Sequence, residues 1–183
     1  MSELVVLLND TLEPIGSAEK LSVHHAYTPL HLAFSCYVFN DEGKLLVTKR
    51  ASTKKVWPGY WTNSVCGHPA PNESFGYAIT RRVQFELGMK VADITCVLPD
   101  YRYSTPPDNG IVENEFCPVY FAKMVTTPNP NPDEVDEYKW LSWTELLEDV
   151  ESHKKEYSYW CKDQLKKLSE SEILKEFAAL GSN

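Results

Sequence analysis

The sequence predicts an α+β fold, with a mixed β-sheet core flanked by helices and additional helices at the C-terminal end. Three observations support this prediction. The first part of the chain holds several short apolar, β-prone runs separated by turn residues. One segment in the middle of the chain has the apolar face and the capping residues of a helix. From residue 143 onward, apolar residues recur at helical spacing.

Length and composition indicate an ordinary globular protein. We expect one domain over residues 1–183, with a helical part at about 143–180, in a monomer or weak homodimer. Apolar residues make up 43% and charged residues 24% of the chain, which is typical of a globular domain. No run approaches the ~18 apolar residues of a membrane span, and the N-terminus lacks the basic start of a signal peptide. We therefore expect a cytoplasmic protein with no membrane partner.

Cysteine usage and charge exclude further classes. The five cysteines are scattered and form no Cys-x-x-Cys pair, which argues against a disulfide framework and a thiolate zinc cluster. The net charge is -8, and the excess acid lies in the C-terminal part of the chain. Because protein surfaces that bind nucleic acid are basic, we expect no nucleic-acid partner.

The N-terminal elements follow from apolar runs and turn residues. Residues 3–8 predict a first strand, and Pro14 and Gly16 predict a turn after it. Residues 19–31 lack clear periodicity and predict a loop. The apolar runs at 32–39 and 44–50 predict a hairpin, because the residues between them include a glycine.

The middle of the chain predicts one helix between strands. Asn72 or Ser74 can cap a helix that runs to about Leu87, and Gly88 is a suitable C-cap. Further strands are expected near 93–98 and 101–104, at 111–123 as one long strand, and near 136–141. Proline-rich segments at 106–110 and 127–132 predict loops. Three helices are expected after residue 143, marked by Leu146, Leu147 and Val150, then Trp160, Leu165 and Leu168, then Ile173, Leu174 and Phe177.

The segment 61–68 carries a thiol and an imidazole two residues apart, Cys66 and His68, with Gly67 between them. Such a thiol is either a small buried hydrophobic group or a chemical group at the rim of a pocket. Paired with His68, it could also act as a nucleophile. The residues alone leave these alternatives open.

Two glutamates, Glu113 and Glu115, lie at the start of the predicted long strand. Side chains two apart on a strand point the same way, so the pair either faces water, shares a proton or binds a cation. His24, His31 and His68 could join them, since imidazole and carboxylate ligands suit Mn²⁺, Zn²⁺, Fe²⁺ or Mg²⁺.

A cluster of basic residues could bind phosphate. It comprises Lys49, Arg50, Lys54, Lys55, Arg81 and Arg82. The alternative is a solvated hairpin end with salt bridges along the helix, because Arg82 and Glu86 are four residues apart.

The segment from Gly67 to Met89 resembles the Nudix box, a loop–helix–loop whose glutamates hold Mg²⁺ on a diphosphate. In this sequence Arg82 and Phe85 replace two of the three core glutamates of the box. The usual Nudix metal cluster cannot form from these residues. The resemblance therefore implies the Nudix fold and argues against diphosphate hydrolysis.

With that departure, residues 3–165 are similar to type I isopentenyl-diphosphate isomerases. The resemblance rests on Leu30-His31-Leu32-Ala33-Phe34-Ser35, Trp57-Pro58-Gly59, Trp61-Thr62-Asn63-Ser64-Val65-Cys66-Gly67-His68-Pro69, Arg81-Arg82, Glu86-Leu87-Gly88 and Ile111-Val112-Glu113-Asn114-Glu115. This family interconverts isopentenyl and dimethylallyl diphosphate, small prenyl diphosphates, by moving a proton across an allyl unit through a tertiary carbocation.

The resemblance implies a role for each matching residue. Cys66 and Glu115 match the family's two acid/base groups. Tyr103 matches a tyrosine that hydrogen-bonds this glutamate, and Trp160 matches a tryptophan whose π-face stabilises the cation. The implied metal ligands are His24, His31, His68, Glu113 and Glu115, which would hold Mn²⁺, Mg²⁺ or Zn²⁺. A second ion, Mg²⁺, would bridge the diphosphate to Glu86 and the Cys66 backbone carbonyl. Lys20, Arg50, Lys54 and Arg82 match diphosphate-binding positions.

Three alternatives compete with the isomerase hypothesis. A Nudix diphosphate hydrolase would need the glutamates that Arg82 and Phe85 replace. An enzyme with Cys66 as nucleophile would need His68 in contact with the thiol. A non-catalytic Nudix-fold binding module would have neither turnover nor a metal.

Overall fold

A computed structural model describes residues 3–105, 110–169 and 171–179. These residues form two β-sheets and five helices, which confirms the predicted α+β class. The predicted loop at 106–110 lies almost wholly outside the described residues. None of the helices in the described part of the chain has the length and apolarity that a membrane span requires.

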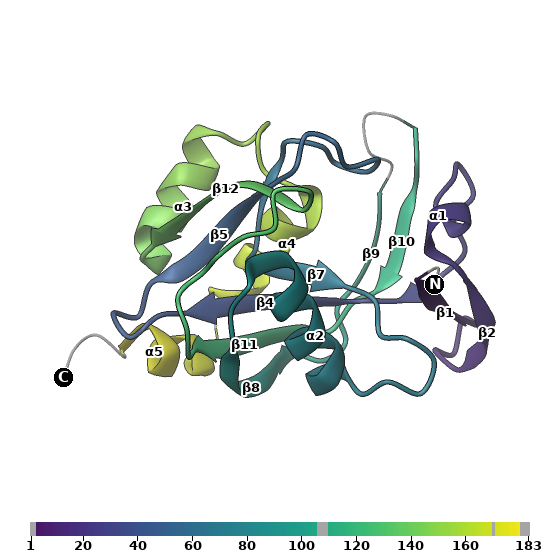
Figure 1. Cartoon of the computed structure of the whole chain (residues 1–183), viewed down its shortest axis with the longest axis horizontal. Coiled ribbons are helices and arrows are strands. Elements are labelled where there is room, and N and C mark those ends of the chain that lie inside the picture. The colour runs from purple at the N-terminus through teal and green to yellow at the C-terminus, as the bar shows by residue number, and fades with distance from the viewer. Residues whose placement is uncertain (1–2, 106–109, 170, 180–183) are drawn as a thin grey trace.

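The larger sheet has seven strands. Its main path runs β12 (Val135–Leu141), β5 (Leu45–Arg50), β4 (Phe34–Phe39), β11 (Val119–Met124) and β8 (Val91–Leu98), with β6 (Trp61–Thr62) paired to β5 and β7 (Val65–Gly67) paired to β4. The smaller sheet has the order β2 (Pro14–Glu19), β1 (Leu4–Leu8), β3 (His31–Leu32), β10 (Glu113–Phe116) and β9 (Arg102–Thr105). Figure 1 shows the smaller sheet at the N-terminal side of the molecule, together with α1.

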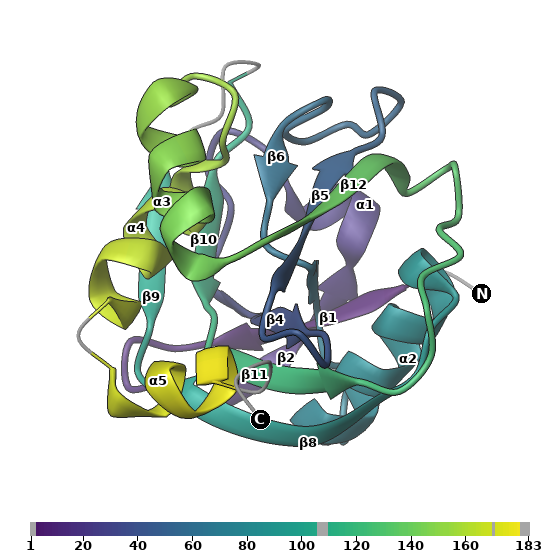
Figure 2. The same cartoon turned by 90° about the vertical axis from the view of Figure 1, so that its left-hand side faces the viewer.

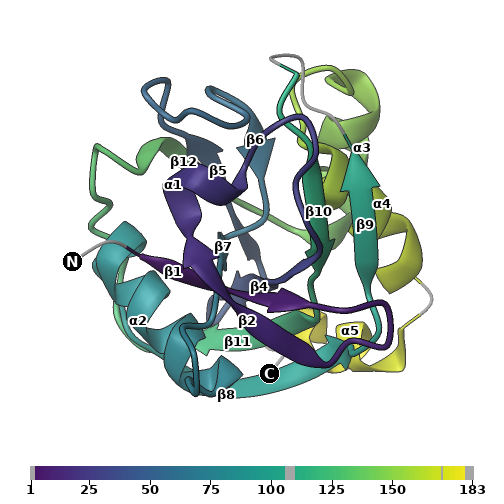
Figure 3. The ribbon, with the colours of Figure 1, turned by 90° about the vertical axis from the view of Figure 1, so that its right-hand side faces the viewer.

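Four helices cover the two faces of the larger sheet: α2 (Phe75–Leu87), α3 (Trp143–Ser152), α4 (Tyr159–Leu168) and α5 (Glu172–Ala178). The short helix α1 (Lys20–Val23) instead contacts β2 of the smaller sheet. Figure 2 shows α3, α4 and α5 on one side of this sheet and α2 on the other. In Figure 3, β1 and β2 run across the front of the molecule, beside β9 and β10.

Strand β4 is buried along its whole length, because both of its faces are covered. Phe34, Cys36 and Val38 contribute to the core under α2. Tyr37 and Phe39 contribute to the core under α3, α4 and α5. This alternation is the period of two that a strand imposes on its side chains, and it explains why the run reads as continuously apolar.

Helix α2 begins and ends as its sequence predicts. The Ser74 side chain accepts a hydrogen bond from the Tyr77 backbone N–H, and Gly88 ends the helix with φ of 59°. Between these caps, Ile79, Val83 and Leu87 are fully buried. Their spacing of four places them on one face, which packs against the larger sheet.

Gly88→Ala is expected to lower the free energy of unfolding by about 2–3 kcal/mol. The positive φ disfavours a side chain, and a Cβ at this position would lie 2.4 Å from the backbone oxygen of Asn129. Urea denaturation measures the loss. Gly76→Ala is the matched control within α2: a Cβ there meets nothing within 4 Å, so this variant should be about as stable as the parent or up to ~1 kcal/mol more stable. Equal stability of the two variants would contradict the prediction.

Three predictions about individual elements were wrong. The expected turn at Pro14 and Gly16 is part of strand β2, and the expected loop at 19–31 contains α1 and the start of β3. The expected long strand at 111–123 is two strands that belong to different sheets. Pro118, which has no backbone N–H to donate, lies at the break between them.

Candidate active site

A pocket of about 520 Å³ opens where the two sheets approach each other. Cys66 reaches it from β7 of the larger sheet, and Glu115 from β10 of the smaller sheet. Lys20 lines it from α1, Arg82 from α2 and Trp160 from α4. Both sheets and three helices thus contribute to one site, which has the usual size of a small-molecule pocket.

Cys66 is half-buried at the pocket wall, on a short strand antiparallel to β4. Its thiol Sγ donates to Asn63 Oδ1 at 3.0 Å and lies 3.4 Å from Ser35 Oγ. Burial raises the pKa of the Cys66 thiol to about 12, so the thiol is protonated at neutral pH. His68 bonds to Glu115 instead, and this geometry gives no support to a Cys66–His68 nucleophile pair.

Glu113 and Glu115 lie on the same side of β10, as predicted, and each is only 6% exposed. The alternative of a solvated strand face is therefore wrong. Glu115 is paired with His31 on β3 and with Tyr103 on β9. The Tyr103 hydroxyl donates to Glu115 Oε2 at 2.9 Å.

The three predicted histidines converge on Glu115. Ligand atoms of His24, His31, His68 and Glu115 all lie within 4.8 Å of one another. Glu113 lies next to this group, with its Oε2 3.9 Å from His24 Nε2. The adjacent His25 is exposed, and its ring accepts a hydrogen bond from the backbone N–H of Tyr27.

The hydrogen bonds of the histidines leave ring nitrogens available for a cation. His24 Nδ1 lies 2.8 Å from the backbone oxygen of Lys20, and His31 Nδ1 lies 3.0 Å from that of Pro29. A carbonyl only accepts, so each Nδ1 carries the proton and the neutral ring has its lone pair at Nε2. His31 Nε2 is buried without a hydrogen-bond partner, 3.5 Å from Glu115 Oε1.

Two lone-pair atoms that face each other in a buried site repel unless a cation lies between them. His68 presents its Nε2 to the same carboxylate oxygen, 3.1 Å from Glu115 Oε1. The unpartnered His31 Nε2, the convergence of these groups and their imidazole and carboxylate chemistry fit a divalent metal ion. The cluster could therefore hold such an ion, and the backbone carbonyls of Lys20 and Pro29 orient two of its rings.

The two glutamates differ in their protonation. Burial, followed by the charge of Glu115, raises the pKa of Glu113 well above its usual range. Burial also opposes ionisation of Glu115, but without a metal ion, hydrogen bonds and positive charge from protonated His31 and His68 outweigh it and hold the pKa of Glu115 well below its usual range. In the absence of a metal ion, one proton on Glu113 thus relieves the repulsion between the pair.

The four predicted diphosphate-binding residues all line the pocket. Lys20 pairs with Glu3 at 2.9 Å, and Lys54 pairs with Glu134. Arg50 donates to the backbone oxygens of Val56 and Trp57. Arg82 pairs with Glu86 at 2.5 Å and with Glu134 at 3.4 Å.

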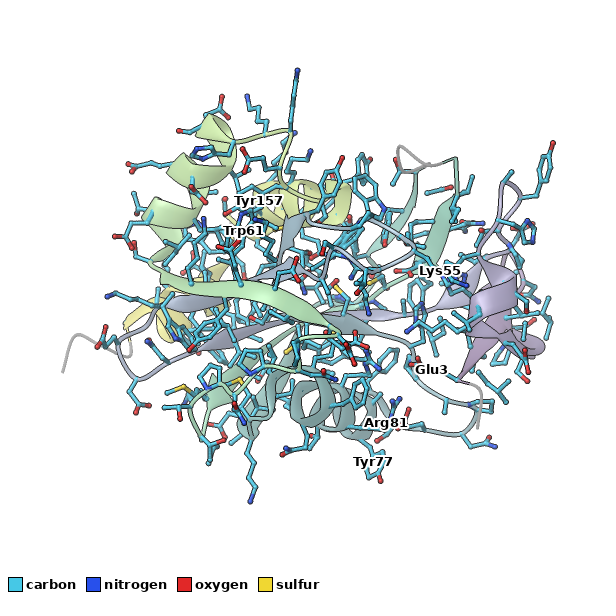
Figure 4. The ribbon with its side chains drawn as sticks, turned by 45° about the horizontal axis from the view of Figure 1, so that its top comes forward. Glu3, Lys55, Trp61, Tyr77, Arg81 and Tyr157 are labelled. Atoms are coloured by element: carbon cyan, nitrogen blue, oxygen red, sulfur yellow. The ribbon has the colours of Figure 1, made fainter. Side chains whose placement is uncertain are left out.

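The wider basic cluster is divided. Lys55 also lines the pocket, and Figure 4 shows it on the same side of the molecule as Glu3. Lys49 instead pairs with Glu137 at 2.8 Å, and Arg81 pairs with Glu73 at 2.7 Å. The alternative of helix salt bridges is correct for Arg82, yet the same guanidinium lines the pocket as well.

Trp160 is placed by the segment that precedes α4. This segment pairs with β6, and Figure 4 shows Trp61 and Tyr157 next to each other at the contact. The Trp160 indole is 3% exposed, and its centroid lies 6.0 Å from that of Tyr103. Its Nε1 donates to Asn63 Oδ1 at 3.0 Å, and the Arg50 guanidinium lies 5.8 Å from its ring centre.

Sequence reasoning missed several residues around the site. Glu3 and Glu134 hold the basic side chains of the pocket, and Asn63 contacts both Cys66 and Trp160. Asn63 belongs to the segment quoted for the family resemblance, which was the one available signal. Glu3 and Glu134 carry no motif, because their partners are distant in sequence.

Comparison with known proteins shows the family to which the chain belongs. The NUDIX domain model matches residues 29–161. An isopentenyl-diphosphate Delta-isomerase of Saccharopolyspora erythraea is 51% identical over 168 residues, which cover 92% of this chain and 87% of that protein. One from Paenarthrobacter aurescens is 50% identical over 94% of both chains. The chain belongs to the isopentenyl-diphosphate Delta-isomerase family of NUDIX-domain proteins. The predicted resemblance is thereby confirmed.

Solved structures support the fold. A Deinococcus radiodurans protein superposes with a TM-score of 0.70 at 18% identity, covering 90% of this chain and 98% of the other. A MutT protein of Methanosarcina mazei gives a TM-score of 0.60 at 18% identity, covering 77% and 94%. The Delta-isomerase family member described here therefore has the Nudix fold predicted from its sequence. Membership of this family favours an isomerase over the hydrolase and binding-module alternatives.

Removing divalent cations with a chelator is expected to lower the melting temperature of this Delta-isomerase family member, and Mn²⁺, Zn²⁺ or Mg²⁺ should restore it. An ion that binds only the folded state at 100 times its Kd adds about 2.7 kcal/mol, or roughly 5–10 °C for a chain of this size. Differential scanning calorimetry measures the shift.

Two histidine variants control this experiment. His31→Ala should lose most of the metal-dependent shift, because His31 belongs to the four-residue cluster. His25→Ala should keep the shift, because this exposed ring lies outside the cluster. An unchanged melting temperature after chelation and metal addition would contradict a structural metal site.

Proposed function

We propose that this protein interconverts isopentenyl diphosphate and dimethylallyl diphosphate by adding a proton at one carbon and removing one from another. One observation carries the proposal. Cys66 and Glu115, two groups able to exchange protons, come from different sheets and line the same pocket. A five-carbon chain between them can be approached by an acid/base group from either sheet, as a 1,3-proton shift requires.

Two aromatic residues support the two acid/base groups. The Tyr103 hydroxyl holds Glu115 through a hydrogen bond of 2.9 Å. Trp160 lines the pocket with its indole, and an aromatic face attracts positive charge. We propose that this face stabilises the tertiary carbocation. The buried aromatic wall also keeps water away from the cation, which water would otherwise capture.

The basic side of the pocket suits the diphosphate. We propose that Lys20, Arg50, Lys54 and Arg82 bind its oxygens, since all four line the pocket. Guanidinium groups give bidentate contacts with phosphate, and ammonium groups act as point charges. Three of these cations are already paired with carboxylates, so the arrangement is held in place before the substrate binds.

Two metal ions complete the proposed site. We propose that His24, His31, His68, Glu113 and Glu115 hold one divalent ion, Mn²⁺, Mg²⁺ or Zn²⁺. Glu86 and the backbone oxygen of Cys66 would hold Mg²⁺ together with the diphosphate, and both residues line the pocket. When bound, the ions neutralise carboxylate and phosphate charge.

Proton NMR in D₂O tests the activity. The protein is incubated with isopentenyl diphosphate and Mg²⁺, and dimethylallyl diphosphate that carries deuterium is the expected product. Recovery of unlabelled substrate would refute the proposal. Release of phosphate or of the monophosphate would instead favour a Nudix hydrolase.

We further propose that the protein acts on this small substrate as a monomer or weak homodimer in the cytoplasm. All five cysteines are unpaired, which agrees with a reducing compartment. Analytical ultracentrifugation tests the oligomeric state, and a stable higher oligomer would contradict it.

A further inference from the structure

Asn63 lies directly behind the pocket wall, between β6 and β7. Its side chain is 0% exposed, and it does not belong to the residues that line the pocket. It therefore cannot touch a molecule bound there. Its side-chain amide nevertheless contacts two residues that do line the pocket, Cys66 and Trp160.

The orientation of the Asn63 amide is set by two backbone carbonyls. Nδ2 donates to the backbone oxygen of Cys36 at 3.1 Å and to that of Val65 at 2.8 Å. Because carbonyl oxygens only accept, the NH₂ group must face them. Both amide protons are thereby used, and Oδ1 points to the opposite side as an acceptor.

Three donors meet at Asn63 Oδ1. They are the Thr62 hydroxyl at 2.9 Å, the Cys66 thiol at 3.0 Å and the Trp160 indole N–H at 3.0 Å. An indole N–H can only donate, so its bond agrees with the orientation that the carbonyls impose. One oxygen atom thus joins β7 to α4, although Asn63 and Trp160 are 97 residues apart in sequence.

We propose that Asn63 is a positioning residue that sets the Cys66 thiol and the Trp160 indole relative to each other. This inference rests on the proposed isomerase function. The proton-transfer group and the aromatic face must act on the same five-carbon unit, and a misplacement of ~1 Å can cost about 100-fold in rate. A single buried acceptor, itself held by two hydrogen bonds, keeps both groups in one geometry.

A second network restrains the other side of the thiol and leaves Asn63 as the link to Trp160. Ser35 Oγ, 3.4 Å from Cys66 Sγ, accepts a hydrogen bond from Gln164 Nε2 at 2.9 Å. Gln164 Oε1 in turn accepts from the Tyr37 hydroxyl at 3.0 Å. This chain of bonds contacts the thiol, whereas among the described contacts Asn63 is the residue that hydrogen-bonds both groups.

Asn63→Leu tests the proposal, because leucine has a similar shape and no acceptor. We expect kcat for isopentenyl diphosphate to fall about 100-fold, with KM changed less than about threefold. The diphosphate-binding side chains do not contact Asn63, which is why KM should stay. A fall in kcat of less than about threefold in Asn63→Leu would overturn the proposal.

Ser64→Ala is the matched control. Ser64 is the next residue and is equally buried, and the substitution removes its two side-chain hydrogen bonds, since its Oγ accepts from Val38 N and donates to Leu46 O. It contacts neither Cys66 nor Trp160 through these bonds. It should lose stability and keep kcat, and an equal loss of kcat in both variants would reduce the role of Asn63 to ordinary structural support.

The indole N–H gives a readout that does not depend on turnover. In ¹H–¹⁵N spectra, the Trp160 Nε1–H signal is assigned by its absence in Trp160→Phe. It should move upfield in Asn63→Leu and stay in place in Ser64→Ala. An unmoved signal in Asn63→Leu would overturn the inference even if kcat fell.

Asn63→Asp serves if Asn63→Leu does not fold. Burial favours the neutral carboxyl, whose O–H can donate to one of the two backbone carbonyls while its other oxygen still accepts from the indole. The indole signal should therefore remain in its hydrogen-bonded position, and kcat should fall less than about tenfold. An upfield shift of the Trp160 Nε1–H signal in Asn63→Asp would also overturn the inference. If the unsubstituted protein does not convert isopentenyl diphosphate, the proposed function fails, and the indole signal still decides whether Asn63 holds Trp160.

Discussion

Cys66→Ala is expected to lower kcat for isopentenyl diphosphate by about 1,000-fold or more while the protein stays folded. Acid/base groups that move a proton in the transition state contribute about 10²–10⁴-fold, and alanine offers no exchangeable proton in its side chain. The substitution removes one half-buried sulfur atom, so the free energy of unfolding should fall by only about 1–2 kcal/mol. Turnover is measured by the appearance of dimethylallyl diphosphate.

Two features make this prediction specific. The metal-dependent rise in melting temperature should persist in Cys66→Ala, because the thiol is not part of the four-residue metal cluster. Cys96→Ala is the control: Cys96 is an exposed cysteine on β8 and should keep full turnover. More than a tenth of the normal kcat in Cys66→Ala would contradict the role of the thiol.

Glu115→Gln is expected to lower kcat as much as Cys66→Ala does, by about 1,000-fold or more, and also to weaken metal binding. Its two carboxylate oxygens serve different partners: Oε1 faces His31 and His68, and Oε2 accepts from the Tyr103 hydroxyl. An amide cannot offer two anionic oxygens, and its NH₂ group must point at one of these partners. The variant should therefore lose both kcat and most of the metal-dependent rise in melting temperature.

The comparison of the two variants separates the two acid/base groups. Cys66→Ala should lose turnover and keep the metal shift, whereas Glu115→Gln should lose both. Glu137→Gln, an equivalent change at an exposed carboxylate on β12 paired with Lys49, should change neither. A Glu115→Gln variant that retains turnover, or that binds metal as tightly as the parent, would contradict the assignment.

Local sequence signals predicted the elements whose determinants lie within a few residues. The caps of α2, Ser74 and Gly88, act on their own helix, so they can be read directly from the chain. The hairpin formed by β4 and β5 is closed by residues adjacent to both strands. Glu113 and Glu115 share a face because strand geometry alone sets the alternation.

Elements that depend on distant partners were not predictable in this way. Strand β2 contains Pro14 and Gly16, and it exists because β1 supplies an antiparallel partner. The break between β10 and β11 sends two adjacent segments into different sheets, which depends on β3 and β4 as their neighbours. Propensity carries no information about which partner is available.

The candidate site shows the same division. The family resemblance named Cys66, Glu115 and the three histidines from the linear sequence, and the fold brings all of them to one pocket or its adjoining cluster. It did not reveal that Glu3 and Glu134 pair with the basic side chains. Such contacts arise only when segments far apart in the chain are packed together.

The sequence by itself determined the fold class, the family and the residues with chemical potential, because these depend on residue type and short-range spacing. Tertiary structure decided the environment of each residue. Burial and the facing histidines separate the pKa values of Glu113 and Glu115. Asn63, an ordinary polar residue in the sequence, is a buried acceptor that joins Cys66 to Trp160, because the chain returns to it 97 residues later.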